Sequence, residues 1–240
     1  MTTKLVSREQ WLEQRKALLE REKAFTRERD ALTEARRALP MVAVDKAYIF
    51  ETEDGSRSLA DLFEGRGQLI VYHFMYGPDW TEGCPSCSFW SDHFDGLDAH
   101  LAARNTAFAM VSNAPLETLL AYRARMGWHI KWVSAGKTTF GEDFGVSFHD
   151  EAALNGTGYN YGQKPYASES PGLSVFSRLA DGTIAHSYST YGRGLDILNT
   201  AYHLLDMTPK GRDEDELPYK MAWIRRRDEY DHFAGGNDHR

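Results

Sequence analysis

An apolar segment of this chain, Gln68-Leu-Ile-Val-Tyr-His-Phe-Met75, is followed closely by the only two cysteines in its 240 residues. The segment has the composition of a strand that is buried on both faces of a sheet. The cysteines, Cys84 and Cys87, are spaced as C-P-S-C. A single pair at this spacing is typical of dithiol–disulfide chemistry or of half a metal site. The order of strand, loop and cysteine pair therefore constrains both the fold and the chemistry.

A helix is expected to begin at the cysteine pair and to extend to about Arg104. In its first turn, residues i and i+3 lie about 5–6 Å apart on one face, a separation that a disulfide tolerates. Pro85 suits the first helical position because no N–H is needed there. The unpaired amides and the positive end of the helix favour a thiolate on Cys84, which makes Cys84 the expected nucleophile. Cys87, one turn further in, is the expected resolving thiol.

Two other roles compete for the cysteine pair. A zinc site needs two further ligands, and the chain has no second cysteine pair. Only His73 and His93 lie near in sequence, and neither has the spacing of a ligand. The other alternative is a packed, unreactive pair. Redox chemistry is favoured over both, so we expect no metal and no cofactor.

Residues 7–39 are predicted to form one long helix, capped by Ser7 with Gln10 and ended by Pro40. Its large apolar residues recur every seven positions. They are Trp11, Leu18, Phe25, Leu32 and Leu39. A coiled coil needs a second apolar position in each heptad, and here the residues four after each anchor are charged. We therefore expect a docking helix with a single apolar stripe, which packs either on the body of this chain or on a second subunit. The second subunit is favoured, and it would make the protein a homodimer.

The remaining elements alternate along the chain. A strand is expected at 42–52, paired through a turn at 53–55 with a short second strand that ends at 58, and a helical turn is expected at 59–63. After the cysteine pair come a buried strand at 107–112, a helix at 115–126, a short strand at 131–134, a long loop at 147–170, a hairpin of 172–178 and 183–188, and a helix at 195–206. This order predicts an α/β fold with right-handed parallel crossovers first and a hairpin last. The expected parts are a docking helix (1–40), a main domain (41–208) and a charged C-terminal extension (209–240).

A strand, a loop, a C-x-x-C helix and a late hairpin followed by a helix together resemble the thioredoxin fold, in which helices flank a central mixed sheet. That fold has a proline facing the dithiol at the start of the late hairpin, and Pro171 matches this position. The resemblance implies that the bond before Pro171 is cis, and that the backbone beside it pairs with an extended substrate.

The segment from Phe74 to Cys84 also resembles the active-site loop of peroxiredoxins, where a proline, a threonine and the peroxidatic cysteine surround the peroxide. Pro78 and Thr81 correspond to the first two, but two residues separate them where that family has three. Peroxiredoxins also place an arginine where this chain has Pro171. Losing that arginine removes a charge-assisted donor pair from the peroxide and the thiolate.

Over nearly its full length, the chain resembles a bacterial thioredoxin-like family of predicted dithiol–disulfide oxidoreductases of unassigned role. The stretches that carry the resemblance are Glu22-Lys-Ala-Phe-Thr-Arg27, Arg36-Arg-Ala-Leu-Pro40, Asp61-Leu-Phe-Glu-Gly65, Val71-Tyr-His-Phe-Met75, Cys84-Pro-Ser-Cys-Ser88, Arg125-Met-Gly-Trp128, Ser189-Thr-Tyr-Gly-Arg-Gly194 and Leu205-Asp-Met-Thr-Pro209. The resemblance implies the fold and a dithiol activity, and it supplies no substrate.

Charge and hydropathy limit the partners and the location of the protein. The net charge of −7 argues against nucleic-acid binding. The charge is uneven, because residues 1–39 hold 10 Lys/Arg against 7 Asp/Glu. No signal peptide and no membrane span are expected, because the longest apolar run is far too short. A cytoplasmic location follows, where a C-x-x-C is more plausibly redox-active than a static crosslink.

Three hypotheses for function remain open. The first is a thiol–disulfide oxidoreductase that acts on a protein or small-molecule disulfide, with Tyr76 and Trp80 as walls of a substrate groove unless they simply pack against the helix start. The second is a thiol peroxidase, and the third is a non-catalytic binding protein. His73 is expected to be a core residue. The tyrosines of the long loop, Tyr159, Tyr161 and Tyr166, are the expected lid over the site.

Overall fold

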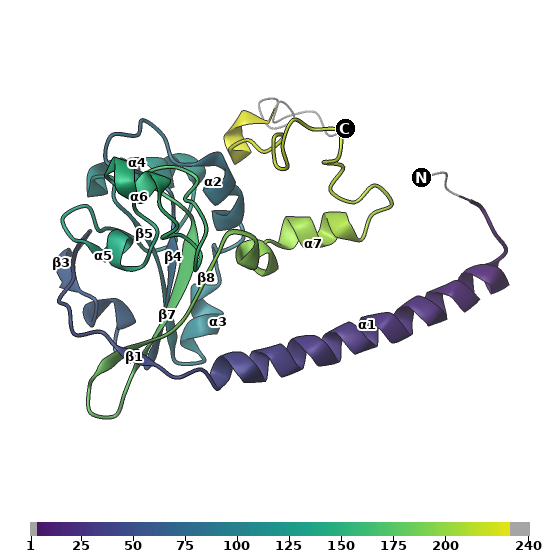
Figure 1. Ribbon diagram of the computed structural model, residues 1–240, viewed down its shortest axis with the longest axis horizontal. Helices are drawn as coiled ribbons and strands as arrows, with labels where there is room; N and C mark the ends of the chain where they lie inside the picture. Colours follow the sequence, from purple (N-terminus) through teal and green to yellow (C-terminus); the bar gives the residue numbers. More distant parts are fainter. Residues whose placement is uncertain (1–3, 231–240) are drawn as a thin grey trace. The chain divides into compact units, whose positions relative to one another are not determined.

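The computed structural model describes residues 4–230 of the chain. The chain divides after Pro40 into two compact units, and each is described by itself. Among the described residues, the first unit contains one long helix (Figure 1). The second unit contains the sheet and the shorter helices.

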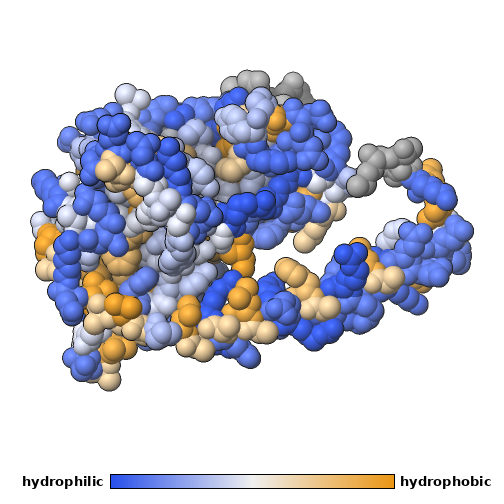
Figure 2. Space-filling model, in the orientation of Figure 1, coloured by the Kyte–Doolittle hydropathy of each residue, from blue (hydrophilic) through white to orange (hydrophobic). Residues whose placement is uncertain are grey.

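Helix α1 spans Arg8–Arg37, as the sequence predicts. Its start is fixed by the predicted capping box: Ser7 Oγ accepts from the Gln10 N–H, and Gln10 Oε1 accepts from the Ser7 N–H, both at 3.2 Å. No residue of α1 is buried, and Figure 2 shows apolar patches open along its surface. Phe25, in the middle of the apolar stripe, is 69% exposed. The helix therefore carries an exposed apolar stripe on an otherwise charged surface.

The second unit is built on a sheet in which the described residues form eight strands, in the order β1-β8-β7-β4-β5-β6-β2-β3. The strands are β1 (Val42–Ala43), β2 (Ile49–Thr52), β3 (Gly55–Ser58), β4 (Gln68–His73), β5 (Thr106–Ser112), β6 (Trp132–Ser134), β7 (Gly172–Arg178) and β8 (Ile184–Tyr191). Strands β4, β5 and β6 run parallel, and the β7–β8 hairpin pairs antiparallel with β4. Strand β4 is buried on both faces, as its apolar sequence predicts.

The hairpin predicted around residues 53–55 is present as β2 and β3, beside β6 at one edge of the sheet. The single strand predicted at 42–52 is divided, because β1 pairs with β8 at the other edge. The chain passes between the two edges because Val44 and Tyr48 pack into the apolar cluster on one face of the sheet. A local alternation of residues cannot show which edge each strand joins.

The shorter helices include those that the sequence predicts and further short ones that it does not, one of which lies within the expected loop at 147–170. They are η1 (Asp61–Phe63), α2 (Pro85–Ser91), α3 (Asp98–Ala102), α4 (Leu116–Met126), α5 (Phe140–Asp143), α6 (Glu151–Asn155), η2 (Gly192–Leu198), α7 (Thr200–Asp206) and η3 (Arg227–Glu229), where η marks a 3₁₀ helix. Two predicted helices are each divided in two. The helix expected at 195–206 is divided into η2 and α7. The helix expected from Cys84 to Arg104 stops at Ser91, and Gly96 with φ of 84° separates it from α3. Together the sheet and its helices form the thioredoxin-like α/β fold that the sequence predicts.

Two apolar clusters cover the two faces of the sheet. One contains Tyr72, Cys87 and Trp90, and the other contains Val71 and Phe176. The C-terminal segment, residues 209–230, adds Ile224 and other apolar side chains to the first cluster. Glu214 ties this segment down, because its Oε1 accepts from Tyr202 Oη, Met221 N and Trp223 Nε1. The part of the expected extension that is described thus packs on the same face of the sheet as the cysteines.

None of the helices among residues 4–230 combines the length and the apolar character that a membrane span requires.

His73, at the end of β4, is a core residue, as expected. Its side chain is 3% exposed, packs against Phe140 and Phe144, and hydrogen-bonds through Nε2 to Ser174 Oγ at 2.8 Å. Burial, assisted by the nearby His186, lowers the pKa of His73 from 6.5 to about 3. His73 therefore stays neutral in the folded protein at all but strongly acidic pH.

We predict that His73 makes the protein less stable as the pH falls from about 6.5 towards 3. In this window the unfolded chain binds the proton that folded His73 excludes, so the free energy of unfolding falls by about 1.4 kcal/mol per pH unit for this group. Urea unfolding at a series of pH values measures the slope. His73→Asn should reduce the slope of the unfolding free energy against pH by the contribution of about one proton. An unchanged slope would show that another group is responsible.

We also predict that deleting residues 1–39 leaves a folded protein, because α1 has no buried residue. If the apolar stripe binds a second subunit, the intact chain is a dimer and the shortened chain is a monomer. Light scattering measures the subunit count, and circular dichroism checks the fold. The same subunit count for both proteins would rule out this dimer role.

Candidate active site

The two cysteines lie at the junction between the central strand and the helix that follows it. Beyond β4, the chain forms a loop that ends when the Cys84 N–H donates to the Met75 carbonyl at 3.1 Å. Cys84 is the N-cap residue of α2, and Pro85 occupies the first position of the helix, as predicted. The hydrogen bond to Met75 anchors the start of α2 beside the end of β4.

The two thiols differ in burial and in their contacts. Cys84 is half-buried, whereas Cys87 is only 1% exposed. The Met75 N–H donates to Cys87 Sγ at 3.5 Å. Both cysteines are free thiols, with no disulfide between them. Cys84 is thus the more accessible thiol, and Cys87 lies behind it.

The pKa values of the two thiols move in opposite directions. The pKa of Cys84 falls from 9.0 to about 7, chiefly because the Cys87 thiol hydrogen-bonds to its sulfur, with further help from the backbone N–H groups of Cys87 and Ser86. Burial is the main reason why the pKa of Cys87 rises well above its usual value, and the neighbouring Cys84 adds to the rise. Near neutral pH, the negative charge therefore rests on Cys84.

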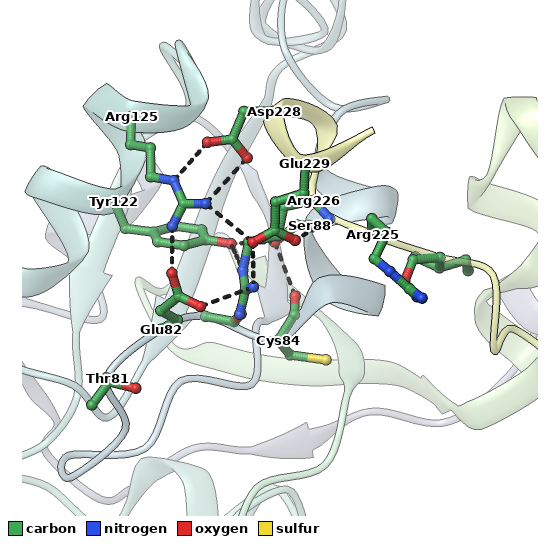
Figure 3. A network of polar contacts seen from close by, with 12 residues as sticks. Thr81, Glu82, Cys84, Ser88, Tyr122, Arg125, Arg225, Arg226, Asp228 and Glu229 are labelled. Atoms are coloured by element: carbon green, nitrogen blue, oxygen red, sulfur yellow. Dashed lines mark hydrogen bonds and ion pairs between the residues drawn. The ribbon is translucent and has the colours of Figure 1, made fainter. Parts of the chain in front are cut away.

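The loop before Cys84 is held from outside by the C-terminal segment (Figure 3). The guanidinium of Arg226 donates to the Gly83 carbonyl from Nη2 at 2.9 Å and to Tyr122 Oη from Nε at 3.0 Å. The Tyr122 hydroxyl lies 2.8 Å from Ser88 Oγ, and Ser88 Oγ donates to the Cys84 carbonyl at 2.9 Å. Arg226 is thereby connected to the backbone of Cys84.

A group of ion pairs surrounds Arg226. Arg226 pairs with Glu82 at 2.9 Å and with Glu229 at 2.8 Å. Arg125 pairs with the same two carboxylates and with Asp228. In Figure 3 the Cys84 sulfur points away from these charges. The network therefore fixes the backbone of the loop rather than contacting the thiol.

Sequence reasoning missed Arg226 because it lies in a charged segment with no helical or strand pattern. The only available signal was Tyr219–Trp223, an aromatic stretch within that segment.

Both cysteines line a cavity of about 310 Å³. Pro171 and Tyr166 form part of its wall, together with residues 219–221 of the C-terminal segment. The structure therefore brings together Cys84, Cys87 and Pro171, three of the residues singled out in the sequence. A larger cavity, of about 480 Å³, lies elsewhere and contains no cysteine, and its charged groups include paired partners such as Arg123 and Glu53.

The resemblance to thioredoxin was wrong in one respect: no peptide bond is cis in the described part of the chain, so the Ser170–Pro171 bond is trans. Segment 168–170 is already paired within the protein, since the Ser170 N–H donates to the Val146 carbonyl at 2.8 Å. The Pro171 carbonyl accepts from Tyr159 Oη, also at 2.8 Å. These hydrogen bonds hold the start of β7 in the trans arrangement.

Tyr76 and Trp80 do not line this cavity. Tyr76 is 1% exposed, packs against Tyr122 and Trp132, and donates its hydroxyl to the Thr81 carbonyl at 3.2 Å. Trp80 is half-buried in the same loop. The structure thus favours the alternative in which these aromatic residues pack against the start of the helix.

The three tyrosines expected as a lid have different positions. Tyr166 lines the cavity. Tyr159 is fully buried, and its hydroxyl bridges Pro171 and Gly192 by accepting from the Gly192 N–H at 2.8 Å. Tyr161 is 78% exposed. Of the three tyrosines, only Tyr166 therefore lines the cavity. Tyr159 is buried and holds Pro171 and Gly192 together through its hydroxyl.

Among residues 4–230 there is no group of three or more His, Cys, Asp or Glu side chains placed to hold a metal ion.

We predict that alkylation of Cys84 by iodoacetamide follows a titration with a midpoint near pH 7, and that Cys84 is labelled before Cys87. Cys87→Ala should move the midpoint upward, because the hydrogen bond that stabilises the thiolate most is lost. Mass spectrometry of labelled peptides at a series of pH values measures both effects. Preferential labelling of Cys87 would reverse the assignment.

Comparisons with known proteins place the chain in a family. Among solved structures, peroxidoxin BcpB from Mycobacterium tuberculosis is 14% identical with a TM-score of 0.47, over 68% of this chain and 94% of that chain. Peroxiredoxin Q from Xanthomonas campestris is 13% identical with a TM-score of 0.45, over 68% and 94%. A comparison with curated proteins found no match. Residues 1–230 match the model of the family described as "Bacterial protein of unknown function (DUF899)", and the chain therefore belongs to that family.

Proposed function

We propose that the protein is a thiol–disulfide oxidoreductase in which Cys84 is the nucleophile and Cys87 the resolving thiol. The observation that carries this proposal is that the two thiols at the start of α2 differ in accessibility and in pKa. Cys84 is accessible from the cavity and has a pKa of about 7, whereas Cys87 is buried and stays protonated. A low-pKa thiolate with a protonated thiol in contact is suited to two successive exchange steps.

The reaction follows from this arrangement. The Cys84 thiolate attacks one sulfur of a disulfide RSSR, so that a Cys84–SR bond forms and the S–S bond breaks, releasing RS⁻. Cys87 then loses its proton to the departing thiolate and attacks the Cys84 sulfur. The second RS⁻ leaves, and the Cys84–Cys87 disulfide remains. The substrate is thereby reduced by two electrons and the dithiol is oxidised, and a dithiol reductant such as dithiothreitol restores the starting state.

The peroxidase alternative has less support in the site. A peroxiredoxin-like mechanism needs a cationic donor at the thiolate, and Pro171 stands at the corresponding position. The nearby Arg226 is engaged with the Gly83 carbonyl, Tyr122 and two carboxylates. The groups that stabilise the Cys84 thiolate most are instead the Cys87 thiol and backbone amides. Disulfide exchange uses these groups directly.

The reduced protein should react with hydroxyethyl disulfide faster than β-mercaptoethanol does at the same pH, because Cys84 is more fully ionised. Stopped-flow tryptophan fluorescence follows formation of the Cys84–Cys87 disulfide. Hydrogen peroxide, tested in parallel, should oxidise the dithiol at a rate no greater than that of an ordinary thiolate. Fast reaction with peroxide and slow reaction with the disulfide would instead establish the peroxidase.

Two matched variants test the order of steps. Cys87→Ser should accumulate the mixed disulfide on Cys84, since the resolving thiol is lost while the nucleophile remains. Cys84→Ser should accumulate none, because Cys87 is buried and protonated. Intact-mass measurement after reaction with the disulfide distinguishes them. Identical behaviour of the two variants would show that the two-step mechanism is wrong.

A further inference from the structure

We infer that the substrate of the Cys84 site is a small disulfide that carries carboxylate groups, rather than an extended segment of another protein. This inference rests on the proposed thiol–disulfide exchange and concerns its substrate class. Three features of the described residues support it. They are a strand edge that is already paired, the C-terminal residues that line one side of the cavity, and the charges of the cavity lining.

The strand edge beside Pro171 is already occupied. Ser147 and Glu169 form an antiparallel bridge, flanked by hydrogen bonds from Phe148 N to the Ser168 carbonyl and from Ser170 N to the Val146 carbonyl, both at 2.8 Å. An extended substrate that added a strand at this edge would need free backbone groups there, such as the Ser170 N–H. The chain's own segment has taken this donor.

Side chains lock this internal pair in place. Glu169 is 4% exposed, and its carboxylate accepts from Ser147 Oγ at 2.8 Å and from Asn113 Nδ2 at 3.0 Å. Removing segment 146–148 to admit a peptide would take the Ser147 hydroxyl away from this buried carboxylate and leave it with the Asn113 amide as its side-chain donor. Losing a hydrogen bond to a buried charged group is costly. A peptide therefore has no ready place to pair.

The C-terminal segment closes another side of the cavity. Tyr219, Lys220 and Met221 line it, and the Met221 N–H is fixed to Glu214 Oε1 at 3.1 Å. The remaining volume of about 310 Å³ equals the space of about ten water molecules. This volume is at the lower end of the range for small-molecule sites. It suits a compact disulfide that approaches Cys84 end-on.

Apart from the Cys84 thiolate, the charged groups of the lining are Arg193, Lys220 and Asp196, so cations exceed carboxylates among them. Asp196 is shared, because its Oδ2 pairs with Arg193 at 3.0 Å and with Arg212 at 3.2 Å. Lys220 pairs with Asp215 at 2.6 Å. Arg193 and Lys220 nevertheless keep most of their side chains exposed, at 86% and 64%. Exposed ion pairs are weak, so each cation can exchange its partner for a carboxylate on an incoming disulfide.

Three disulfides of the same skeleton test the charge: dithiodipropionate is anionic, hydroxyethyl disulfide is neutral, and cystamine is cationic. Each rate with the reduced protein at low ionic strength is divided by the rate of that disulfide with deuterium-labelled β-mercaptoethanol, which removes intrinsic reactivity. The label makes the otherwise degenerate exchange with hydroxyethyl disulfide measurable. We expect the normalised rate to be highest for dithiodipropionate and lowest for cystamine, and added salt to reduce the difference. Insulin, as a protein disulfide, should be the poorest substrate.

Variants connect the preference to its residues. Arg193→Gln and Lys220→Gln should each lower the rate with dithiodipropionate, relative to the rate of the same variant with hydroxyethyl disulfide, by about two- to fivefold, as expected for exposed ion pairs. Lys137→Gln is the matched control, because Lys137 pairs with Glu51 and does not line the cavity.

The outcomes separate this inference from the proposed function. Equal normalised rates for the three small disulfides, or faster reaction with insulin, would overturn the substrate class while the dithiol activity stands. Failure of every disulfide, the neutral one included, to react faster than with β-mercaptoethanol would overturn both.

Discussion

The backbone hydrogen bond from Cys84 to the Met75 carbonyl is the interaction on which the site depends. It joins the N-terminus of α2 to the end of the central strand, and so fixes where the helix amides point. Those amides and the Cys87 thiol lower the pKa of Cys84. Because β4 is buried between β5 and β7, the sheet core gives this junction a rigid base. Reactivity at the surface thus derives from packing in the interior.

A second support comes from the far end of the chain. Arg226 reaches the Gly83 carbonyl, and Tyr122 with Ser88 continues the contact to the Cys84 carbonyl. The same C-terminal segment forms part of the cavity wall. The position of Cys84 and access to it therefore both depend on this one segment. A change in how this segment packs would alter both together.

Much of the fold and part of the site could be predicted from local sequence. The capping box of α1, the buried strand β4 and the greater exposure of Cys84 than of Cys87 depend on neighbouring residues, whose spacing directly determines their geometry. The edge positions of β1 and β2 and the trans bond before Pro171 could not be predicted in this way. They depend on pairing with segments distant in sequence. The burial of Tyr76 also depends on distant residues, because its ring packs against Tyr122 and Trp132.

The sequence by itself determined the chemistry available to this protein: one dithiol, placed after a buried strand and at the start of a helix. Helix-terminal electrostatics act within a single turn, so the spacing of Cys84, Pro85 and Cys87 was sufficient for that conclusion. Only the tertiary structure decided what can reach the dithiol. Segment 146–148 occupies the neighbouring strand edge, and residues 219–221 close the cavity. Both arise from long-range hydrogen bonding and apolar burial, which bring together residues that no local pattern connects.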